Sequence, residues 1–512
     1  MKETKRTLLK ILAGYLVLAC LAVLLVNRIS YEMQPKYTYK NTKWPTTASI
    51  NGFYKMKRNS IDVLFLGSSY CVNAFCPQEI YNKYGIRSFN LGSEQQSISL
   101  SYYWLKEALR FQHPKAVVIE MKFILPLHPE EPLNMDEGLL RKCIDPMKWS
   151  SVKAEAVKDV CQRDDKQSEL SYYLPIQRYH SRWSAGLTSD DLDRRIYTDG
   201  RLKGWDGTIR NGPTEFNTFK ISDREIKNWM DVAPLQKEYL YKIAALCKEN
   251  NMHLILTHIP GVDQMTDSLN NECNEMAAEI GASYYNFYED SMFKKLDLQL
   301  PKDNACDHPN VWGAIKLSDF LGDVFANEFG IDSTYDSQYE DTKDIFEQVK
   351  KNASLMYTSD FDEYLSLLKD SSYTVFFSIS DDGTLLLTNE DMERLKALGI
   401  QSDLIGKFQY SWAAVIDPLY GVSESLSGDS SVKLSGAIGE PGGSYSVSST
   451  GLRTGASGSS ILINEKEHSR NTRGINIVVW DNYCNTIIDS VTFDTNGDRS
   501  SSGPNPNVDT WW

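Results

Sequence analysis

Apolar and polar positions along residues 51–332 follow a regular order of short apolar runs and longer amphipathic stretches. The apolar runs predict buried strands at 61–66, 86–91, 116–121, 253–257 and 283–287. Stretches with helical periodicity predict helices at 77–84, 97–111, 235–249, 265–280 and 311–329. Strands that alternate with helices favour an α/β fold, in which a parallel sheet carries helices on both faces.

Other regions depart from this rhythm. Residues 128–232 are more polar and predict a long insertion or cap, and the acidic, helix-prone residues 333–370 are expected to join two domains. Short β-rich runs between Gly/Ser-rich turns then predict a smaller β-rich domain over 371–497, before a loose tail at 498–512. The runs in this domain are TVFFSI, TLLLT, WAAVI, SSILIN, INIVVW and DSVTFD, with one helix expected at 391–398.

The chain begins with a cationic stretch and an apolar run. Residues 8–26 are apolar except for Lys10, and a membrane-spanning helix needs ~20 such residues. No small-residue cleavage site follows, so we expect an uncleaved signal anchor between a cytoplasmic tail at 1–7 and a polar stalk at 27–50. Basic residues on both sides of the run favour a cytoplasmic N-terminus only weakly. The prediction is a single-pass protein of the cell membrane, with the bulk of the chain extracytoplasmic.

Charge and cysteine content exclude several classes of function. The 512 residues carry a formal net charge of −14, and a surface this acidic repels phosphate backbones, so no nucleic-acid partner is expected. The nine cysteines contain no Cys-x-x-Cys pair, which fits neither a disulfide framework nor a zinc site. No metal and no cofactor are therefore expected.

Three short segments carry residues suited to acyl-transfer chemistry. Gly67-Ser68-Ser69 ends the first predicted strand, where the carboxyl end of a parallel strand opens on the ligand cleft. Asn90-Leu91-Gly92-Ser93 ends the second strand, where a glycine lets the backbone approach closely and donate an N–H. His308, at the entry to the last helix with carboxylates just before it, suits a general base.

In this order and spacing the three segments resemble the SGNH (GDSL-like) hydrolase family, over roughly residues 58–330. The resemblance implies a flavodoxin-like parallel sheet, with Ser69 as the nucleophile and His308 as the base. It also implies that the backbone N–H groups of Ser69 and Gly92 form the oxyanion hole.

The chain departs from the family pattern at two places. The family has Asp three residues before its histidine, where this chain has Ala305. We expect Asp303 to complete the triad, with Asp307 as the alternative. The asparagine of the family's third block is also missing, because the third strand ends in Glu120-Met121-Lys122. A third oxyanion donor would have to come from Lys122, Gln95 or Gln96, and complete loss of catalysis stays open.

Further polar residues are candidates for substrate binding, although a purely structural role is the simpler interpretation of several of them. His258 ends another predicted strand, and the insertion contains a Tyr-His-Ser-Arg-Trp segment. The candidates are Lys122, Gln95, His180, Arg182, Trp183 and His258.

The order of anchor, stalk and SGNH-like domain is similar to the teichoic-acid D-alanylation (DltD) and alginate O-acetylation protein families. Segments 473–479 and 489–495, with 445–449 upstream, make 371–497 resemble the interleukin-like EMT inducer (ILEI) domain. These resemblances imply an O-acyltransferase or esterase that acts on a cell-surface polysaccharide, with a membrane-bound O-acyltransferase as partner. They also imply a glycan-binding or protein-docking role for the C-terminal domain. The alternative is a non-catalytic surface protein that binds glycans or proteins through a degenerate SGNH cleft.

Overall fold

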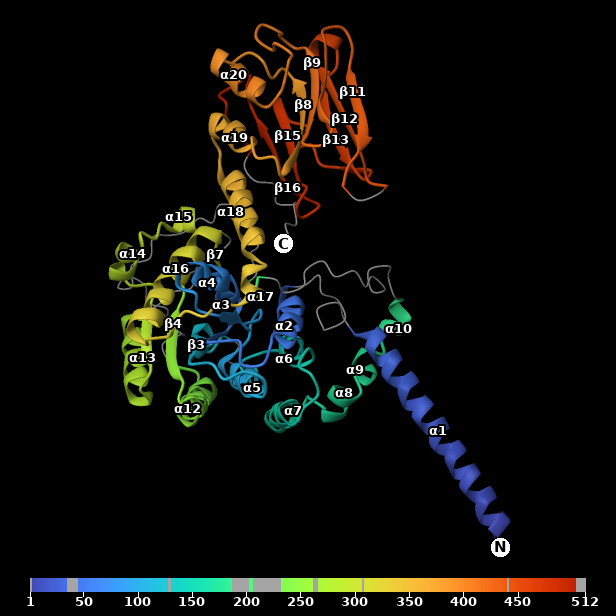
Figure 1. Ribbon diagram of the computed structural model, residues 1–512, viewed down its shortest axis with the longest axis vertical. Coiled ribbons are helices and arrows are strands. Elements are labelled where there is room, and N and C mark those ends of the chain that lie inside the picture. The colour runs from blue at the N-terminus through green and yellow to red at the C-terminus, as the bar shows by residue number, and fades with distance from the viewer. Residues whose placement is uncertain are drawn as a thin grey trace. The chain divides into compact units, whose positions relative to one another are not determined.

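The computed structural model describes residues 2–34, 45–127, 130–186, 202–205, 232–260, 266–305, 308–439 and 442–502 (Figure 1). They fall into two compact units, which divide between Thr342 and Lys343. The first unit holds the α/β core and the insertion, and the second holds the β-rich region.

A five-stranded parallel sheet, in the order β2-β1-β3-β4-β5, is the centre of the first unit. Each strand lies where the apolar pattern predicted one, so the α/β fold with a parallel sheet is confirmed. The strands are β1 (Val63–Leu66), β2 (Ser88–Asn90), β3 (Ala116–Glu120), β4 (His253–His258) and β5 (Ser283–Asn286).

Helices cover both faces of this sheet because alternate residues of its strands point to opposite sides. Leu64 and Leu66 of β1 pack into one core cluster with α5, α12 and α13, whereas Val63 and Phe65 pack into another with α3, α4 and α16. The helices are α3 (Ser69–Ala74), α4 (Pro77–Tyr84), α5 (Ile98–Ala108), α12 (Pro234–Glu249), α13 (Asp267–Ile280) and α16 (Val311–Asp323), which continues as one π-helical turn, Val324–Glu328.

Residues 130–186 of the insertion are mainly helical and contribute Leu140 and Tyr172 to a third, smaller core cluster of this unit. Its helices are α6 (Glu137–Ile144), α7 (Ser151–Arg163), α8 (Glu169–Tyr173), α9 (Ile176–Tyr179) and α10 (Arg182–Ala185).

The N-terminal helix α1 (Lys2–Met33) contains the expected apolar span, and its segment Thr7–Ser30 is long and apolar enough to cross a membrane. The structure differs from the irregular stalk expected at 27–50. Helix α1 continues through Met33, and α2 (Pro45–Lys55) begins well before the expected end of the stalk. Helix α2 forms because Ile50 and Phe53 are buried in the core beside Phe89.

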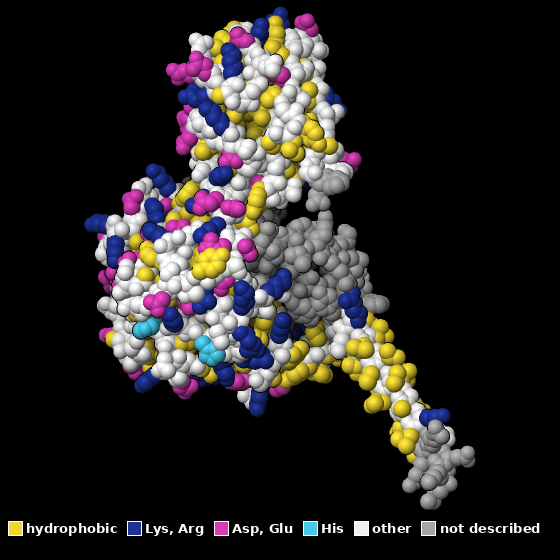
Figure 2. Space-filling model, in the orientation of Figure 1, with side chains coloured by type: hydrophobic (Ala, Val, Ile, Leu, Met, Phe, Trp, Pro, Cys, Tyr) yellow, Lys and Arg dark blue, Asp and Glu magenta, His cyan; other side chains and the backbone are white. Residues whose placement is uncertain are grey.

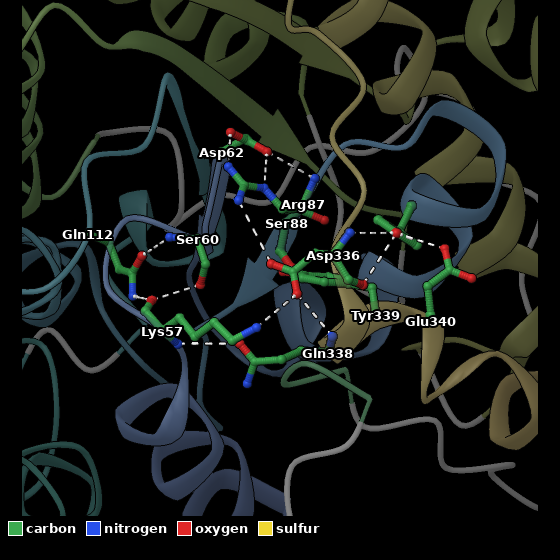
Figure 3. A network of polar contacts seen from close by, with 11 residues as sticks. Lys57, Ser60, Asp62, Arg87, Ser88, Gln112, Asp336, Gln338, Tyr339 and Glu340 are labelled. Carbon is green, nitrogen blue, oxygen red and sulfur yellow. Dashed lines mark hydrogen bonds and ion pairs between the residues drawn. The ribbon is translucent and has the colours of Figure 1, made fainter.

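The segment expected to join two domains is divided between them. Its first part, with α17 (Ser337–Glu340), is fastened beside edge strand β2 by the polar network in Figure 3. Arg87 donates two hydrogen bonds to Asp62, at 2.8 and 2.9 Å, and lies 3.8 Å from Asp336. The buried Tyr339 donates to the carbonyl of Ser88 at 2.6 Å.

The second part of that segment belongs to the β-rich unit. It forms α18 (Lys343–Tyr357) and α19 (Phe361–Leu367), which bond directly to strands of that unit. Asn352 of α18 donates to Asp481 at 2.8 Å, and Tyr364 of α19 donates to Asp489 at 2.8 Å.

A nine-stranded mixed sheet with helix α20 (Asn389–Ala397) forms the rest of the second unit. The strand expected in TLLLT is wrong, since this segment forms a turn that ends in Thr388, the N-cap of α20. Residues 498–502, expected to be loose, are held by Arg499, which donates to Asp391 at 2.7 Å; the rest of that tail lies outside the described residues. The strands are β8 (Tyr373–Asp381), β9 (Ser411–Asp417), β10 (Gly421–Ser427), β11 (Val432–Ala437), β12 (Ser444–Gly451), β13 (Gly458–Ile463), β14 (Lys466–Glu467), β15 (Gly474–Asp481) and β16 (Thr486–Phe493).

Candidate active site

Ser69 and His308 meet at the carboxyl edge of the parallel sheet. Ser69 is the first residue of α3, directly after the turn that leaves β1, and His308 opens the short strand β7 (His308–Pro309) before α16. The Oγ atom of Ser69 lies 2.8 Å from Nε2 of His308, although the two residues are 239 positions apart in the chain. This distance allows a hydrogen bond in which the imidazole accepts the serine proton.

A cavity of about 310 Å³ opens on this pair. Its wall combines the serine turn, the histidine and the segment that follows β3, so it can hold a small polar group beside Ser69 Oγ. The lining residues are Ser68, Ser69, Tyr70, Gln95, Lys122, Phe123, Leu127 and His308.

A buried carboxylate holds the turn that carries Ser69. Glu120, the last residue of β3 and 3% exposed, accepts hydrogen bonds from Ser68 N–H at 3.1 Å and Ser68 Oγ at 2.6 Å. Its other oxygen accepts from the N–H of Lys122 at 2.6 Å. Burial raises the pKa of Glu120, and these three hydrogen bonds oppose that shift.

The glycine before the two serines is required by this close packing. Gly67 has φ +148°, and a Cβ atom there would lie 2.6 Å from the Cβ of Glu120. A side chain at this position would push the serine turn away from β3.

The imidazole of His308 is positioned by an aromatic neighbour. The ring of Tyr70 stacks on it with a centroid distance of 4.4 Å and an interplanar angle of 29°. The ammonium of Lys122 lies 4.2 Å from the Tyr70 ring centroid, within the range of a cation–π contact. Lys122 and Tyr70 therefore form one wall of the cavity together with His308.

The expectation that Asp303 orients His308 is wrong. The carboxylate of Asp303 accepts from Lys316 Nζ at 2.9 Å and from the N–H of Gln299 at 2.6 Å, and no hydrogen bond joins it to the described His308. Pairing of β6 (Asn304–Ala305) with β7 instead places Ala305 directly opposite His308. The alternative, Asp307, lies outside the described residues.

The N–H of Gly92, expected to form part of the oxyanion hole, is already hydrogen-bonded to another residue. The N–H of Gly92 donates to the side-chain oxygen of Asn90 at 3.2 Å, and Gly92 does not line the cavity. The N–H of Ser69 differs, because the first N–H of a helix has no acceptor within the helix. No backbone oxygen among the described residues accepts it.

Of the remaining candidates, Lys122 and Gln95 line the cavity, whereas Gln96 is buried and bonds to Ser93 and Ser101. His258 does not line this cavity, and it is buried with Nδ1 2.8 Å from the Tyr284 hydroxyl. Burial lowers the pKa of His258 to about 3, so its imidazole is neutral near pH 7.

The candidates from the insertion also lie outside the lining of this cavity. His180 is exposed and contacts the carbonyl of Gln177, while Arg182 donates to the carbonyls of Met33 and Gln34. The side chain of Trp183 lies outside the described part of the chain.

Sequence reasoning did not identify two residues of the site, Glu120 and Tyr70. Glu120 was visible as a carboxylate at the carboxyl end of a central buried strand, a position that is rarely charged without a partner. Tyr70 gave no comparable signal, because its stacking on His308 depends on a residue far away in the chain. Among the described residues, no group of three or more His, Cys, Asp or Glu side chains is placed to hold a metal ion.

No protein-family model and no curated protein sequence matches this chain.

Proposed function

We propose that this protein is a membrane-anchored, extracytoplasmic serine O-acyltransferase or esterase that acts on acyl groups of cell-envelope polysaccharide. The observation that carries the proposal is the 2.8 Å contact between Ser69 Oγ and His308 Nε2 inside a cavity. The apolar helix segment Thr7–Ser30 supports the membrane anchor. The polysaccharide substrate and a membrane-bound O-acyltransferase partner rest on the family resemblance alone.

In the proposed reaction, Ser69 Oγ attacks the carbonyl carbon of an acyl ester while its proton passes to Nε2 of His308. His308 then protonates the departing alcohol oxygen, and the acyl group stays on Ser69. In the second half, a water or sugar hydroxyl attacks the acyl-enzyme and gives its proton to His308, which returns it to Ser69 Oγ. An esterase and a transferase differ only in this second acceptor.

The negative charge on the tetrahedral intermediate requires hydrogen-bond donors beside Ser69. The N–H of Ser69, at the start of α3, is one proposed donor, and the ammonium of Lys122 in the cavity wall is the other. Lys122 would replace the asparagine of the SGNH pattern with a full positive charge. This assignment would give Lys122 the catalytic role that the asparagine has in the SGNH pattern.

A serine-directed fluorophosphonate probe tests the proposal on the full-length protein. We expect labelling of the wild type, no labelling of Ser69→Ala, and slower but persistent labelling of the matched variant Ser68→Ala. The neighbouring serine is an informative control because it shares the turn but bonds to Glu120 rather than to His308. Equal labelling of Ser69→Ala and wild type would contradict the proposal.

A second candidate function is non-catalytic binding of a glycan or protein through the same cleft. The diversion of Asp303 to Lys316 and of the Gly92 N–H to Asn90 favours it, because both leave the expected catalytic geometry incomplete. A wild type that binds an envelope polysaccharide but does not react with the probe would support binding. Acyl release without transfer to a sugar would instead identify an esterase.

A further inference from the structure

Hydrogen bonds join the insertion to the C-terminal end of helix α1, just after its apolar segment Thr7–Ser30. Arg182 of α10 donates to the carbonyl of Met33 at 3.0 Å and to that of Gln34 at 2.6 Å. These carbonyls lie at the C-terminal end of helix α1. They belong to the third and fourth residues after Ser30, where the apolar segment ends. A cation at a helix C-terminus is stabilising, so the contact suits both partners. Helices α9 and α10 therefore lie at the level where α1 leaves the apolar span.

An exposed apolar patch lies on the part of the insertion that precedes this contact, on α8 and on the loop before α7. Trp149 and Tyr173 stack with a centroid distance of 4.9 Å and an interplanar angle of 12°. Leu170 lies one helical turn before Tyr173 on the same face of α8. Their exposed fractions are 50% for Trp149, 46% for Tyr173 and 55% for Leu170. Figure 2 shows hydrophobic side chains gathered on the first unit beside the end of α1.

Buried polar contacts fasten α8, which carries Leu170 and Tyr173, and its neighbour α9 to the rest of the insertion. Arg141, 1% exposed, lies 3.7 Å from the ring centroid of Tyr172 and donates to the carbonyl of Ser171 at 3.2 Å. Tyr179 of α9 donates to the buried Asp145 at 2.8 Å. These contacts hold α8 and α9 in place. Turning Leu170 and Tyr173 toward the protein interior would therefore break a buried cluster of charged residues.

We propose that the patch of Trp149, Leu170 and Tyr173 rests in the interfacial layer of the bilayer that α1 crosses. Tryptophan and tyrosine are enriched at this layer, because an apolar ring and a polar edge suit it. A lone spanning helix leaves the attached unit free to rotate about the helix axis. A second contact beside that axis fixes which face of the unit is turned to the lipid surface. The inference rests on the proposed membrane anchorage.

The test places a fluorophore on the patch of the full-length protein in phosphatidylcholine/phosphatidylglycerol vesicles. Leu170→Cys carries an environment-sensitive NBD label, and Tyr335→Cys is the matched control, a 78% exposed aromatic position of the same unit beside the β2 network. Wild type treated with the same reagent corrects for the native cysteines. Quenching by a spin-labelled lipid is compared with quenching by aqueous iodide, and flotation reports whether the protein is bound to the vesicles.

The ratio of lipid quenching to iodide quenching is expected to be several-fold higher at position 170 than at position 335. Equal ratios at both positions, in protein that floats with the vesicles, would overturn the inference and leave the anchor intact. Protein that does not float would overturn the membrane anchorage and this inference together. Catalysis is judged separately by the fluorophosphonate probe, so its failure does not affect this result.

Discussion

The serine side and the histidine side of the site each contain one buried carboxylate, and the two are used differently. Glu120 receives three hydrogen bonds from neutral donors of Ser68 and Lys122, which belong to the site itself. Asp303 is paired with the ammonium of Lys316, away from His308. The role of a buried carboxylate is therefore decided by its hydrogen-bonding partners and not by its distance in sequence from the histidine.

It follows that Ser69 and His308 are positioned by different means. Ser69 is held through its neighbour Ser68 by hydrogen bonds to a carboxylate in the sheet. Among the described contacts, His308 is positioned by the β6–β7 pairing and by stacking on Tyr70. Substitutions on the two sides should therefore have effects of different size and kind, measured as the second-order rate of fluorophosphonate labelling.

The largest effect is expected from His308→Ala, which removes the proton acceptor. The labelling rate should fall about 10²–10⁴-fold, the contribution of a general base. His180→Ala, an exposed histidine outside the cavity lining, is the matched control and should retain the wild-type rate. A His308→Ala protein that reacts as fast as wild type would remove the histidine side from the mechanism.

A smaller loss of labelling rate is expected from Glu120→Gln. An amide presents an N–H₂ group at a place where one carboxylate oxygen accepted a hydrogen bond. Displacement of the serine turn should lower the labelling rate by up to about 10²-fold. Since burial raises the pKa of Glu120, the wild-type carboxyl becomes neutral as the pH falls through that raised value. The ratio of wild-type to variant rates should therefore shrink toward low pH, whereas a constant ratio would contradict a role for the charge.

Features that depend on local patterns could be predicted from the sequence, whereas features that depend on contacts between distant segments could not be predicted from such patterns. The strand positions were predictable because apolar periodicity is a local signal. That Ser69 and His308 meet was expected from the resemblance to the SGNH family. Asp303 was predicted wrongly because Lys316, 13 residues later on α16, takes its carboxylate. Glu120 stood out as a carboxylate at the end of a buried strand, but its hydrogen bonds to Ser68 and the stacking of Tyr70 on His308 join distant segments. A single sequence does not show which distant segments meet.

The smallest effect on labelling is expected from Asp303→Asn. Its rate should stay within about twofold of wild type, because the lost charge faces Lys316 and not the imidazole. The free energy of unfolding in urea should fall by about 1–3 kcal/mol, because a hydrogen bond to a charged group is lost. A large loss of labelling without loss of stability would restore Asp303 to the triad.

The dependence of the labelling rate of Ser69 on pH tests the central claim most directly, that His308 activates this serine. In the wild type, the rate should rise with pH as one group loses its proton, and peptide mass spectrometry should find the probe on Ser69. In His308→Gln the rate should be low and should no longer rise through that ionisation. The same pH-dependent rise in both proteins, or a probe attached to another serine, would contradict the account.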